Sequence, residues 1–198
     1  MLQNAVSEAF LERLPVYLNQ LKTYDNEYIS STQLANDLNL GHVQVRKDLA
    51  RISEKGKPKV GYLVKDLRSD IKDYLSFSRK TNAIIVGMGQ LGRALYHYQG
   101  FEHFNINIMG GFDINDKYLH IDQLHSFCQN KKIDIAIITT PHDQAQKICD
   151  RLVKENIKGI WNFAPIHLNV PKDVIVQNEN LANSVSILRK ILDDRRQV

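Results

Sequence analysis

The stretch AIIVGMGQLGRAL (residues 83–95) decides the fold of this 198-residue chain. A short apolar run ends at Gly87, and Gly89 and Gly92 complete the pattern GxGxxG at the start of a helical sequence. In this pattern the first glycine allows a tight turn, the second lets the backbone approach a pyrophosphate, and the third lets the helix pack on the strand. The order of strand, glycine turn and helix therefore predicts a Rossmann-like unit that binds a dinucleotide.

Further apolar or β-branched runs follow the glycine turn, and helical patterns separate them. The alternation of strands with helices predicts an α/β fold with a parallel sheet wound by right-handed crossovers. The expected strands are 83–87, 106–113, 134–140, 159–163 and 174–178, and the expected helices are 90–99, 119–130, 141–155 and 179–195. The last helix has a broad apolar face, formed by Leu181, Val185, Leu188 and Leu192 with Ile187 and Ile191 beside them. This face is too broad to be covered by one shallow packing partner.

An acidic residue ends the second strand, about twenty residues after the glycine turn. Asp113 holds this place, where a carboxylate hydrogen-bonds the adenosine ribose and disfavours a 2′-phosphate. The sequence thus predicts NAD(H) rather than NADP(H). The predicted loop contacts are Gly87, Met88, Gly89, Gln90, Leu91 and Gly92.

The N-terminal part reads as a helical unit. Leu11, Leu14, Leu18 and Leu21 predict one face of a helix over 7–22. Residues 24–29 are polar and predict a turn. Ser30 and Gln33 have the spacing of a capping box and start a short helix with Leu34 and Leu38 inward. Gly41 breaks this helix, and a second helix is expected over 42–53. A β-hairpin over 55–65 follows, and then a helix that starts at Asp66 with Leu67, Ile71 and Leu75 on one face. A linker is expected over 76–82, so this part of the sequence predicts a winged helix-turn-helix.

The helix over 42–53 has the pattern of a recognition helix. Val45, Leu49 and Ile52 face the core, whereas the opposite face is basic with small apolar groups between the charges. Cations suit phosphates or guanine acceptors, and Val43 or Ala50 suits a thymine methyl group; the pattern leaves open whether Arg46 or Lys47 reaches a base. The predicted DNA contacts are Val43, Gln44, Arg46, Lys47, Arg51, Lys55, Lys57, Lys59 and Tyr62.

Charge and composition agree with a DNA-binding module. The net charge is +4, and the segment from Arg46 to Lys59 holds six basic residues against two acidic ones, a surplus of four. No apolar run is long enough to span a membrane, and the N-terminal sequence MLQNAVSEAFLERL has no signal-peptide core. We therefore expect a mature cytoplasmic protein, with Cys128 and Cys149 reduced and no metal site.

The sequence lacks a catalytic set near the expected nicotinamide. His142 and His167 follow expected strands, but a histidine at a helix start or in a loop is more often a capping or surface residue. The part of the chain after the winged helix has about 120 residues, which leaves no room for a separate substrate domain. We therefore expect a binding protein and no enzyme.

QVRKDLA (44–50), GMGQLGRAL (87–95), YQGF (98–101), FD (112–113) and GIWNFAP (159–165) together resemble the Rex family of redox-sensing transcriptional repressors. The resemblance implies a homodimer that binds a palindromic double-stranded DNA operator when NAD+ prevails and releases it when NADH accumulates. It implies domains over 1–78, 79–178 and 179–198, the last a helix swapped between subunits. Arg46, Lys47 and Asp48 match the family's recognition helix, and Gly56, Gly61 and Tyr62 match its wing.

The resemblance also assigns the other end of the dinucleotide site. Thr140 and Pro141, with the segment Asn162, Phe163, Ala164 and Pro165, match the family's nicotinamide pocket. Tyr98 matches a tyrosine implicated in the switch.

The chain departs from the family pattern in three places. In the wing, Lys55 replaces an aromatic residue and Pro58–Lys59 replaces Arg–Gly. The segment after Asp113 is shorter by about a dozen residues, which removes a glycine-rich turn and a short strand near the adenine. Asn19 and Asn180 stand where many members carry an Arg and an Asp that pair across the dimer, and Asn180 is therefore a candidate switch residue. Because a charge-assisted pair is stronger than an amide pair, we expect a shifted or weakened response to NADH.

Two alternatives stay open from sequence alone. One is an NAD-dependent enzyme with a DNA-binding appendage, which turnover assays would reveal. The other is a divergent DNA-binding paralogue that has lost NADH sensing or binds another nucleotide, such as a CoA derivative.

Overall fold

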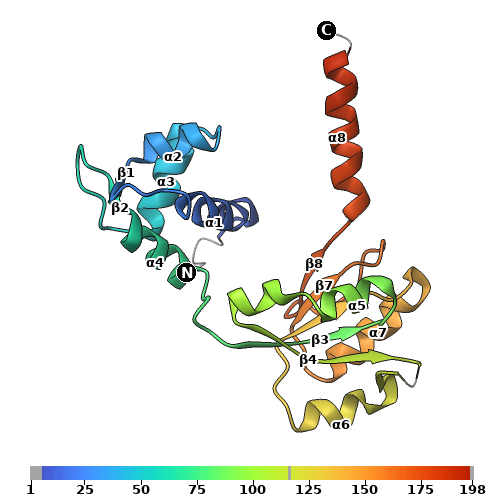
Figure 1. The fold of residues 1–198 in the computed structure, drawn as a ribbon. Coiled ribbons are helices and arrows are strands. Elements are labelled where there is room, and N and C mark those ends of the chain that lie inside the picture. Colours follow the sequence, from blue (N-terminus) through green and yellow to red (C-terminus); the bar gives the residue numbers. More distant parts are fainter. Residues whose placement is uncertain (1–5, 116, 197–198) are drawn as a thin grey trace. The chain divides into compact units, whose positions relative to one another are not determined.

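The structure, a computed structural model, describes residues 6–115 and 117–196. The chain divides into two compact units, residues 1–79 and 80–198 (Figure 1). Residues 1–5 and 197–198, which belong to the first and last predicted domains, lie outside the described residues. In the described part of the chain, no helix has the length and apolar character needed to cross a membrane.

In its described residues, the first unit packs four helices and a two-stranded sheet around one core. Its elements are α1 (Glu8–Leu21), β1 (Tyr28–Ile29), α2 (Ser31–Asp37), α3 (His42–Ile52), β2 (Tyr62–Leu63) and α4 (Val64–Tyr74). The buried side of α1 is formed by Phe10, Leu14, Tyr17, Leu18 and Leu21. Leu11 is 39% exposed, so its expected place on this face was wrong: the buried stripe starts one residue earlier, at Phe10.

The helix-turn-helix forms as its capping signals indicate. Ser30 Oγ accepts a hydrogen bond of 3.0 Å from the Gln33 amide at the start of α2, which satisfies an otherwise free helix amide. The Gln33 side chain bonds Asp37 instead of returning to Ser30, so only half of the expected capping box is present. Val45 and Leu49 are buried on the inner side of α3, and Ile52 is half-buried.

The wing differs from the expected hairpin. Within residues 54–61 a single bridge joins Lys57 to Gly61, and β2 pairs antiparallel with β1, a strand in the segment expected to be a turn. Gly61 has φ +96°, and a Cβ there would lie 2.2 Å from the Ile29 carbonyl oxygen. The return of the wing to β1 therefore requires glycine, and α4 then begins at Val64, two residues before Asp66.

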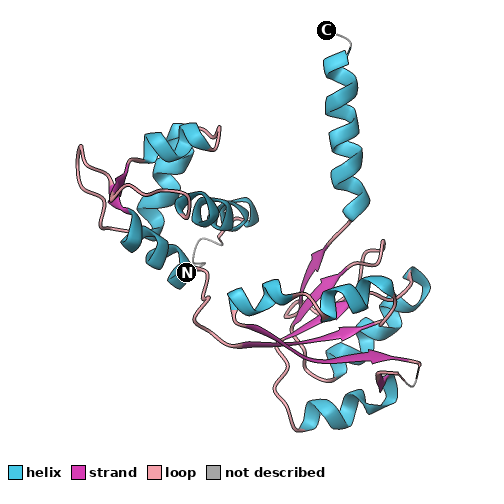
Figure 2. Cartoon of the chain, viewed as in Figure 1, coloured by secondary structure: helices cyan, strands magenta, loops and turns pink. Residues whose placement is uncertain are grey.

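The second unit is a six-stranded parallel sheet with helices on both faces (Figure 2). Its elements are β3 (Thr81–Val86), α5 (Gln90–Tyr96), η1 (Gln99–Phe104), β4 (Ile106–Asp113), β5 (Leu119–His120), η2 (Ile121–Gln123), α6 (Leu124–Gln129), β6 (Ile135–Ile138), α7 (His142–Lys154), β7 (Gly159–Asn162), β8 (Ile175–Asn178) and α8 (Leu181–Arg196). The order β5-β4-β3-β6-β7-β8 reverses direction between β3 and β6. This is the doubly wound order that places ligands at the carboxyl ends of the strands, at the reversal.

The two faces of β3 serve two cores. Ile84 and Val86 pack with residues of α6 and α7, whereas Ile85 packs on the other side with Met88 and Phe101. This alternation follows from the two-residue period of a strand. Because both faces are covered, the strands read in the sequence as continuous apolar runs.

Two expectations for this unit were wrong. The stretch over 119–130 was expected to be helical throughout, but it starts with β5, which pairs with Phe112 and Asp113 of β4. A two-residue strand therefore follows Asp113, although the segment was expected to lack a short strand near the adenine. The expected helix over 90–99 ends at Tyr96 and continues into η1.

Candidate nucleotide site and nucleic-acid interface

The glycine turn between β3 and α5 is shaped by its neighbours. Gly87 has φ +102°, and a Cβ there would lie 2.7 Å from the Thr140 amide nitrogen. A Cβ at Gly92 would lie 2.0 Å from the Gly87 carbonyl oxygen. At Gly89, by contrast, a Cβ would meet no atom within 4 Å. Two glycines thus close the turn, and the third leaves open space in front of the main chain.

This open space belongs to a pocket of about 630 Å³ at the carboxyl ends of β3, β4 and β6. Its volume is in the range of small-molecule and cofactor sites. Thr140 Oγ1 is buried beside it and has no hydrogen-bond partner among the described residues, so a ligand would supply one. The pocket is lined by Val86, Gly87, Gly89, Gln90, Leu91, Asp113, Ile114, Ile121, Thr139, Thr140, Pro141, Gln144 and Ile148.

Several of these lining residues were not predicted from the sequence. Ile114, Ile121 and Ile148 make one part of the wall apolar, and Ile114 is 77% exposed. They come from three different segments, so only the sheet order brings them together. Thr139 holds the turn from behind, because its hydroxyl donates to the Gly87 carbonyl at 2.6 Å.

Asp113 ties the end of β4 to the glycine turn. Its Oδ2 accepts the Met88 amide at 2.5 Å, and its Oδ1 accepts the Ile114 and Asn115 amides. A carboxylate oxygen has more than one acceptor position. Oδ2, which accepts one hydrogen bond from the described residues, therefore keeps capacity to accept a ribose hydroxyl.

The other predicted half of the site is held by its own hydrogen bonds. Asn162 is fully buried, and its Nδ2 donates to the carbonyls of Ala164 and Ile166 and to Asn178 Oδ1, each within 3.0 Å. Its Oδ1 accepts the Ala164 amide. No residue from 162 to 165 is among the described residues that line the 630 Å³ pocket. The side chain of Asn162 thus shapes the turn, and contact of the turn with a ligand stays a prediction.

Met88 and Gly92 are also absent from the described lining of the pocket. The Met88 side chain is buried in the core with Ile85 and Phe101, and its amide is the group that meets Asp113. Gly92 is buried behind the turn. Both act on the turn from inside the unit.

The candidate switch residues lie on exposed surfaces. Tyr98 is 59% exposed, and its ring packs edge-on against Phe101 at 5.3 Å between centroids. Asn180 Oδ1 accepts the Ala182 amide at the start of α8. Asn19 Oδ1 accepts a bond from Lys22. Each asparagine thus has a partner close to it in the sequence.

The structure describes the two candidate histidines and both cysteines. His142 and His167 are exposed at the surface. Cys128 and Cys149 are free thiols, and burial raises the pKa of Cys149 to about 11. A thiol with a raised pKa is a poor nucleophile at neutral pH. Among the described residues, no group of three or more His, Cys, Asp or Glu side chains forms a metal site.

A buried polar network supports α3 from behind. Asp48 Oδ2 accepts bonds of 2.7 Å from Arg13 Nε and from the Tyr17 hydroxyl, and Asp48 Oδ1 accepts one from Gln44. Burial alone would raise the pKa of Asp48, but the hydrogen bonds from Arg13, Tyr17 and Gln44 outweigh it and hold that pKa below the usual value. Arg13 and Tyr17 were missed from the sequence, because only folding brings α1 against α3.

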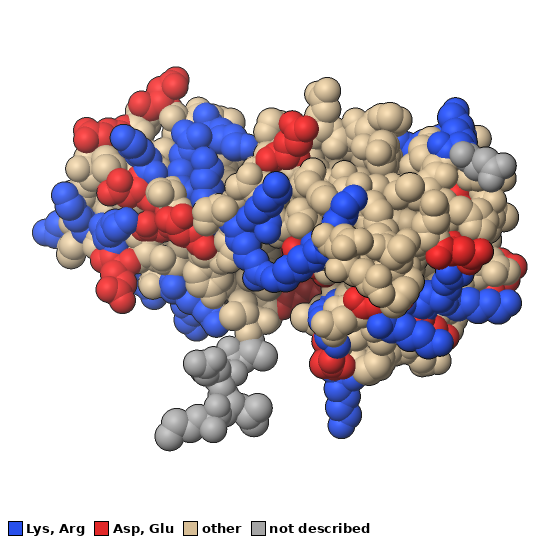
Figure 3. Space-filling model, turned by 90° about the horizontal axis from the view of Figure 1, so that it is seen from below, with Lys and Arg blue, Asp and Glu red and all other residues tan. Residues whose placement is uncertain are grey.

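The predicted DNA contacts divide into two groups. Val43, Arg46 and Lys47 are exposed on the outer side of α3, and Lys59 is exposed at the tip of the wing. The other predicted contacts have partners within the unit. Gln44 donates a hydrogen bond to Asp48, Lys55 pairs with Asp70, and Tyr62 is half-buried against Gly56. Two cations lie over aromatic rings: Arg51 is 5.0 Å from the centre of the Phe10 ring, and Lys57 is 5.7 Å from that of Tyr28. Figure 3 shows Lys and Arg side chains interspersed with Asp and Glu on the face of the molecule seen from below.

Two family models match the chain. One, described as "CoA binding domain", covers residues 78–166, and the other, "Putative DNA-binding protein N-terminus", covers residues 5–50. They match the part with the glycine turn and the part with the helix-turn-helix, respectively.

Two relatives that match nearly the whole chain carry the same name. The redox-sensing transcriptional repressor Rex of Clostridium botulinum (strain Hall) is 39% identical over 201 residues, which covers 95% of this chain and 96% of the relative. The protein of that name from Clostridium acetobutylicum is 37% identical, with 96% and 94% covered. Both are named as transcriptional repressors and not as enzymes.

Solved structures agree over nearly the full length. A crystal structure of RSP in complex with β-NAD+ and operator DNA has a TM-score of 0.90 at 35% identity and covers 98% of this chain and 96% of that chain. RSP in complex with β-NADH has a TM-score of 0.89 at 34% identity, with 98% of both chains covered. With a glycine turn at the sheet reversal, an outward basic helix in a helix-turn-helix, and relatives similar over both units, the chain belongs to the Rex family of redox-sensing transcriptional repressors.

Proposed function

We propose that this chain is a transcriptional repressor that binds operator DNA when NAD+ prevails and releases it when NADH accumulates. The observation that carries the proposal is the pocket at the sheet reversal, lined by Gly87, Gly89 and Asp113, in a chain that also presents an exposed basic α3. The relatives are named redox-sensing repressors, and RSP was crystallised with β-NAD+ and operator DNA.

NAD(H) fits the lining of the pocket. The open main chain at Gly89 receives the pyrophosphate, and Asp113 Oδ2 accepts from the adenosine ribose. The adenine lies in the apolar part formed by Ile114, Ile121 and Ile148. Thr140 Oγ1 supplies a polar group on the β6 side. A 2′-phosphate beside Asp113 would face a like charge, so NADP(H) binds more weakly.

The nicotinamide end distinguishes the two redox states. The turn over 162–165 and the exposed Tyr98 are the groups that we place at this end. Only a difference in affinity between the DNA-bound and DNA-free conformations lets a ligand drive release. We propose that NADH favours the arrangement in which the two recognition helices no longer match the spacing of their half-sites.

On the DNA side, α3 enters the major groove. Arg46 and Lys47 contact phosphates or guanines, Val43 contacts base methyl groups, and Lys59 contacts a phosphate from the wing. Gln44, Arg51, Lys57 and Tyr62 remain predicted contacts, although each has a partner within the unit.

The proposed partner protein is a second copy of the chain. α8 exposes Leu181, Val185, Ile187, Leu188, Ile191 and Leu192, each by 46% or more. An isolated helix of 16 residues is marginal in water. The face of the sheet on which Ile85 packs also carries an apolar pocket of about 420 Å³, lined in part by Phe101, Ile137 and Trp161. We propose that these surfaces are covered in a homodimer in which α8 is exchanged.

A repressor acts where the chromosome is, so we propose a cytoplasmic location. The exposed His142 and His167 have no place in a catalytic mechanism under this proposal. The nucleotide acts as a signal and leaves the site unchanged.

Fluorescence anisotropy tests the proposal. An operator is first selected from random duplexes by the protein with NAD+ present, and the complex is then titrated at fixed salt with NADH, NAD+ and NADPH. We expect release by NADH at concentrations at which NAD+ and NADPH have no effect. Tight binding that none of the three changes would refute redox sensing and leave DNA binding in place.

One observation favours a second ligand class. The family model over residues 78–166 is described as a CoA binding domain, and CoA also carries an adenosine and a pyrophosphate. CoA and acetyl-CoA therefore belong in the same titration, and release by them alone would identify the divergent paralogue.

A further inference from the structure

Lys55 at the base of the wing does not point freely into solvent. Its Nζ lies 2.6 Å from Asp70 Oδ1 on α4. The Asp70 side chain is only 14% exposed, whereas Lys55 is 58% exposed. The ion pair thus joins the long, exposed side chain of Lys55 to the mostly buried carboxylate of Asp70. It connects the segment that leaves α3 with the helix that follows the wing.

The surroundings of Lys55 are acidic. Asp66 and Asp73 lie on the same side of α4 as Asp70, because they are four residues before it and three after it. All three carboxylates raise the pKa of Lys55, Asp70 chiefly by its hydrogen bond. DNA phosphates would be repelled by the same three groups. A lysine that neutralises this patch is poorly placed to give its charge to a phosphate.

The main chain of this segment is held as well. The Ser53 amide donates to the Leu49 carbonyl at the end of α3, and the Lys55 amide donates to Ser53 Oγ at 3.3 Å. Ser53 is buried. The path from α3 into the wing is therefore fixed by Ser53 on the α3 side and by Lys55 on the α4 side. Two residues later, Lys57 and Gly61 form the bridge that closes the wing.

We infer that Lys55 is a positioning residue that holds the base of the wing against α4 through Asp70, and that it makes no phosphate contact. The inference rests on the proposed DNA binding and replaces the predicted DNA contact at Lys55. It assigns Lys55 a structural role, since its ion pair with Asp70 joins the wing to α4.

The sign of one substitution separates the two roles. If Asp70 merely restrains a lysine that contacts DNA, Asp70→Asn would free that lysine, remove a negative charge, and tighten binding. If Lys55 positions the wing, Asp70→Asn weakens operator binding. We expect weakening by about threefold to tenfold, or about 0.7 to 1.4 kcal/mol, and the same for Lys55→Met, which keeps the aliphatic stem. The double variant should bind no more weakly than either single one.

Salt dependence separates the two roles once the proposed phosphate contact of Lys59 on the wing is removed. Each phosphate contact adds about 0.9 to the slope of log K against log salt concentration. In a Lys59→Met background, Lys55→Met should leave this slope unchanged, whereas Lys47→Met on α3 is the matched control that should lower it. The exchanged pair Lys55→Asp with Asp70→Lys should restore binding. A lower slope on adding Lys55→Met to that background, or tighter binding in Asp70→Asn, would overturn the inference.

Hydrogen exchange of the full-length protein tests the inference without DNA. The amides of Lys57 and Gly61 bond across the wing, and their exchange should quicken in Lys55→Met and Asp70→Asn but not in Lys47→Met. If the unmodified protein binds no selected operator, the proposed function fails, and this measurement still decides the role of the pair. Unchanged exchange in both variants would refute the positioning role.

Discussion

The two units of the chain build their proposed binding surfaces in opposite ways. The DNA-binding unit presents side chains, Arg46 and Lys47, on a helix held from behind by the buried Asp48. The nucleotide-binding unit presents main chain at Gly89, in a turn that exists because Gly87 and Gly92 have no side chains. The difference shows which substitutions should damage each surface. The DNA-binding surface depends on the polar residues buried behind α3, whereas the nucleotide-binding surface depends on the absence of side chains in the glycine turn.

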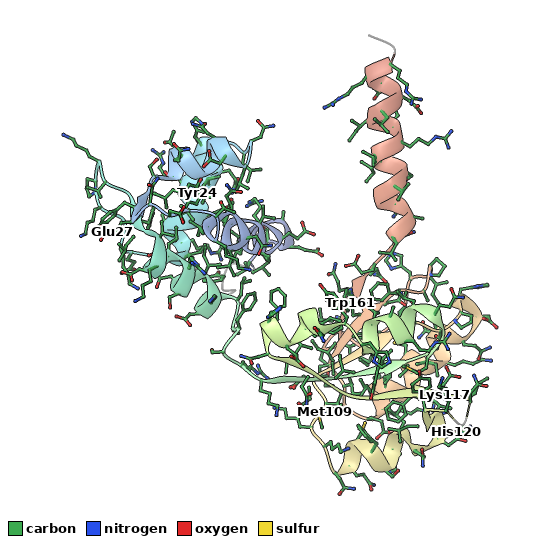
Figure 4. All side chains as sticks on the ribbon, in the orientation of Figure 1. Tyr24, Glu27, Met109, Lys117, His120 and Trp161 are labelled. Carbon is green, nitrogen blue, oxygen red and sulfur yellow. The ribbon has the colours of Figure 1, made fainter. Side chains whose placement is uncertain are left out.

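The nucleotide unit should suffer the largest effect from a single added side chain. Gly92→Val places a Cβ 2.0 Å from the Gly87 carbonyl oxygen, so we expect a loss of more than about 4 kcal/mol in the free energy of unfolding of this unit. Thermal unfolding followed by fluorescence of Trp161, the single tryptophan, measures it. Trp161 lies in the sheet on β7 (Figure 4).

Gly89→Ala is the matched control, because its Cβ meets nothing within 4 Å. Stability should stay within about 0.5 kcal/mol, while NAD(H) affinity falls by more than about tenfold, or 1.4 kcal/mol. Equal unfolding temperatures for Gly92→Val and the unmodified chain would remove the volume argument.

In the DNA-binding unit the weak point is Asp48. Asp48→Asn removes the charge that faces Arg13, and we expect a loss of about 2 kcal/mol, because the arginine is partly solvated. Gln44→Ala, which removes one exposed donor, should cost less, about 1 kcal/mol. Denaturant unfolding followed by circular dichroism compares them. A cost for Asp48→Asn no larger than that for Gln44→Ala would contradict the support role.

The same residue predicts a pH dependence. The folded pKa of Asp48 lies below its ordinary value of 3.8, so the unfolded chain binds its proton first as the pH falls. The stabilisation is complete above about pH 5 and is lost as the pH drops through 3.8 toward the folded pKa. Asp48→Asn should abolish this part of the acid sensitivity. An identical acid profile in the variant would exclude Asp48 as its source.

The response to NADH is expected to be shifted or weakened in this chain, because Asn19 and Asn180 replace the charged pair that the resemblance places across the dimer. Asn19→Arg with Asn180→Asp restores the charged pair that the family resemblance implies, and we expect NADH-induced release at about tenfold lower NADH. Asn180→Asp alone is the control, since aspartate also caps a helix start. Release at the same NADH concentration in the double variant and the unmodified chain would show that the two asparagines do not limit the response.

The smallest effect concerns the tip of the wing. Lys59 has φ +63°, a left-handed conformation that costs a non-glycine residue about 1 kcal/mol. Lys59→Gly should therefore stabilise the DNA-binding unit by up to about 1 kcal/mol and weaken DNA binding through the lost charge. Asn156→Gly, at φ +61° in the other unit, should gain less because asparagine tolerates this region. Lower stability of Lys59→Gly would contradict the strain.

Some elements were predicted correctly from the sequence. The strand over 106–113 has the predicted bounds, and the glycine turn lies where GxGxxG placed it. An apolar run and a glycine spacing are visible within a few residues of the sequence, so composition and spacing predict these features. β1 and β5, of two residues each, were missed because pairing with a distant strand defines them.

The sequence by itself determined the recognition helix, the glycine turn and the place of Asp113, because period, capping and glycine spacing are local properties. Only the tertiary structure decided which charged residues remain free. Lys55 and Arg51 looked like Lys47 in the sequence, yet one meets Asp70 and the other lies over Phe10. The physical reason is that a charge acts on whatever folding brings within a few ångströms, and that neighbourhood is non-local.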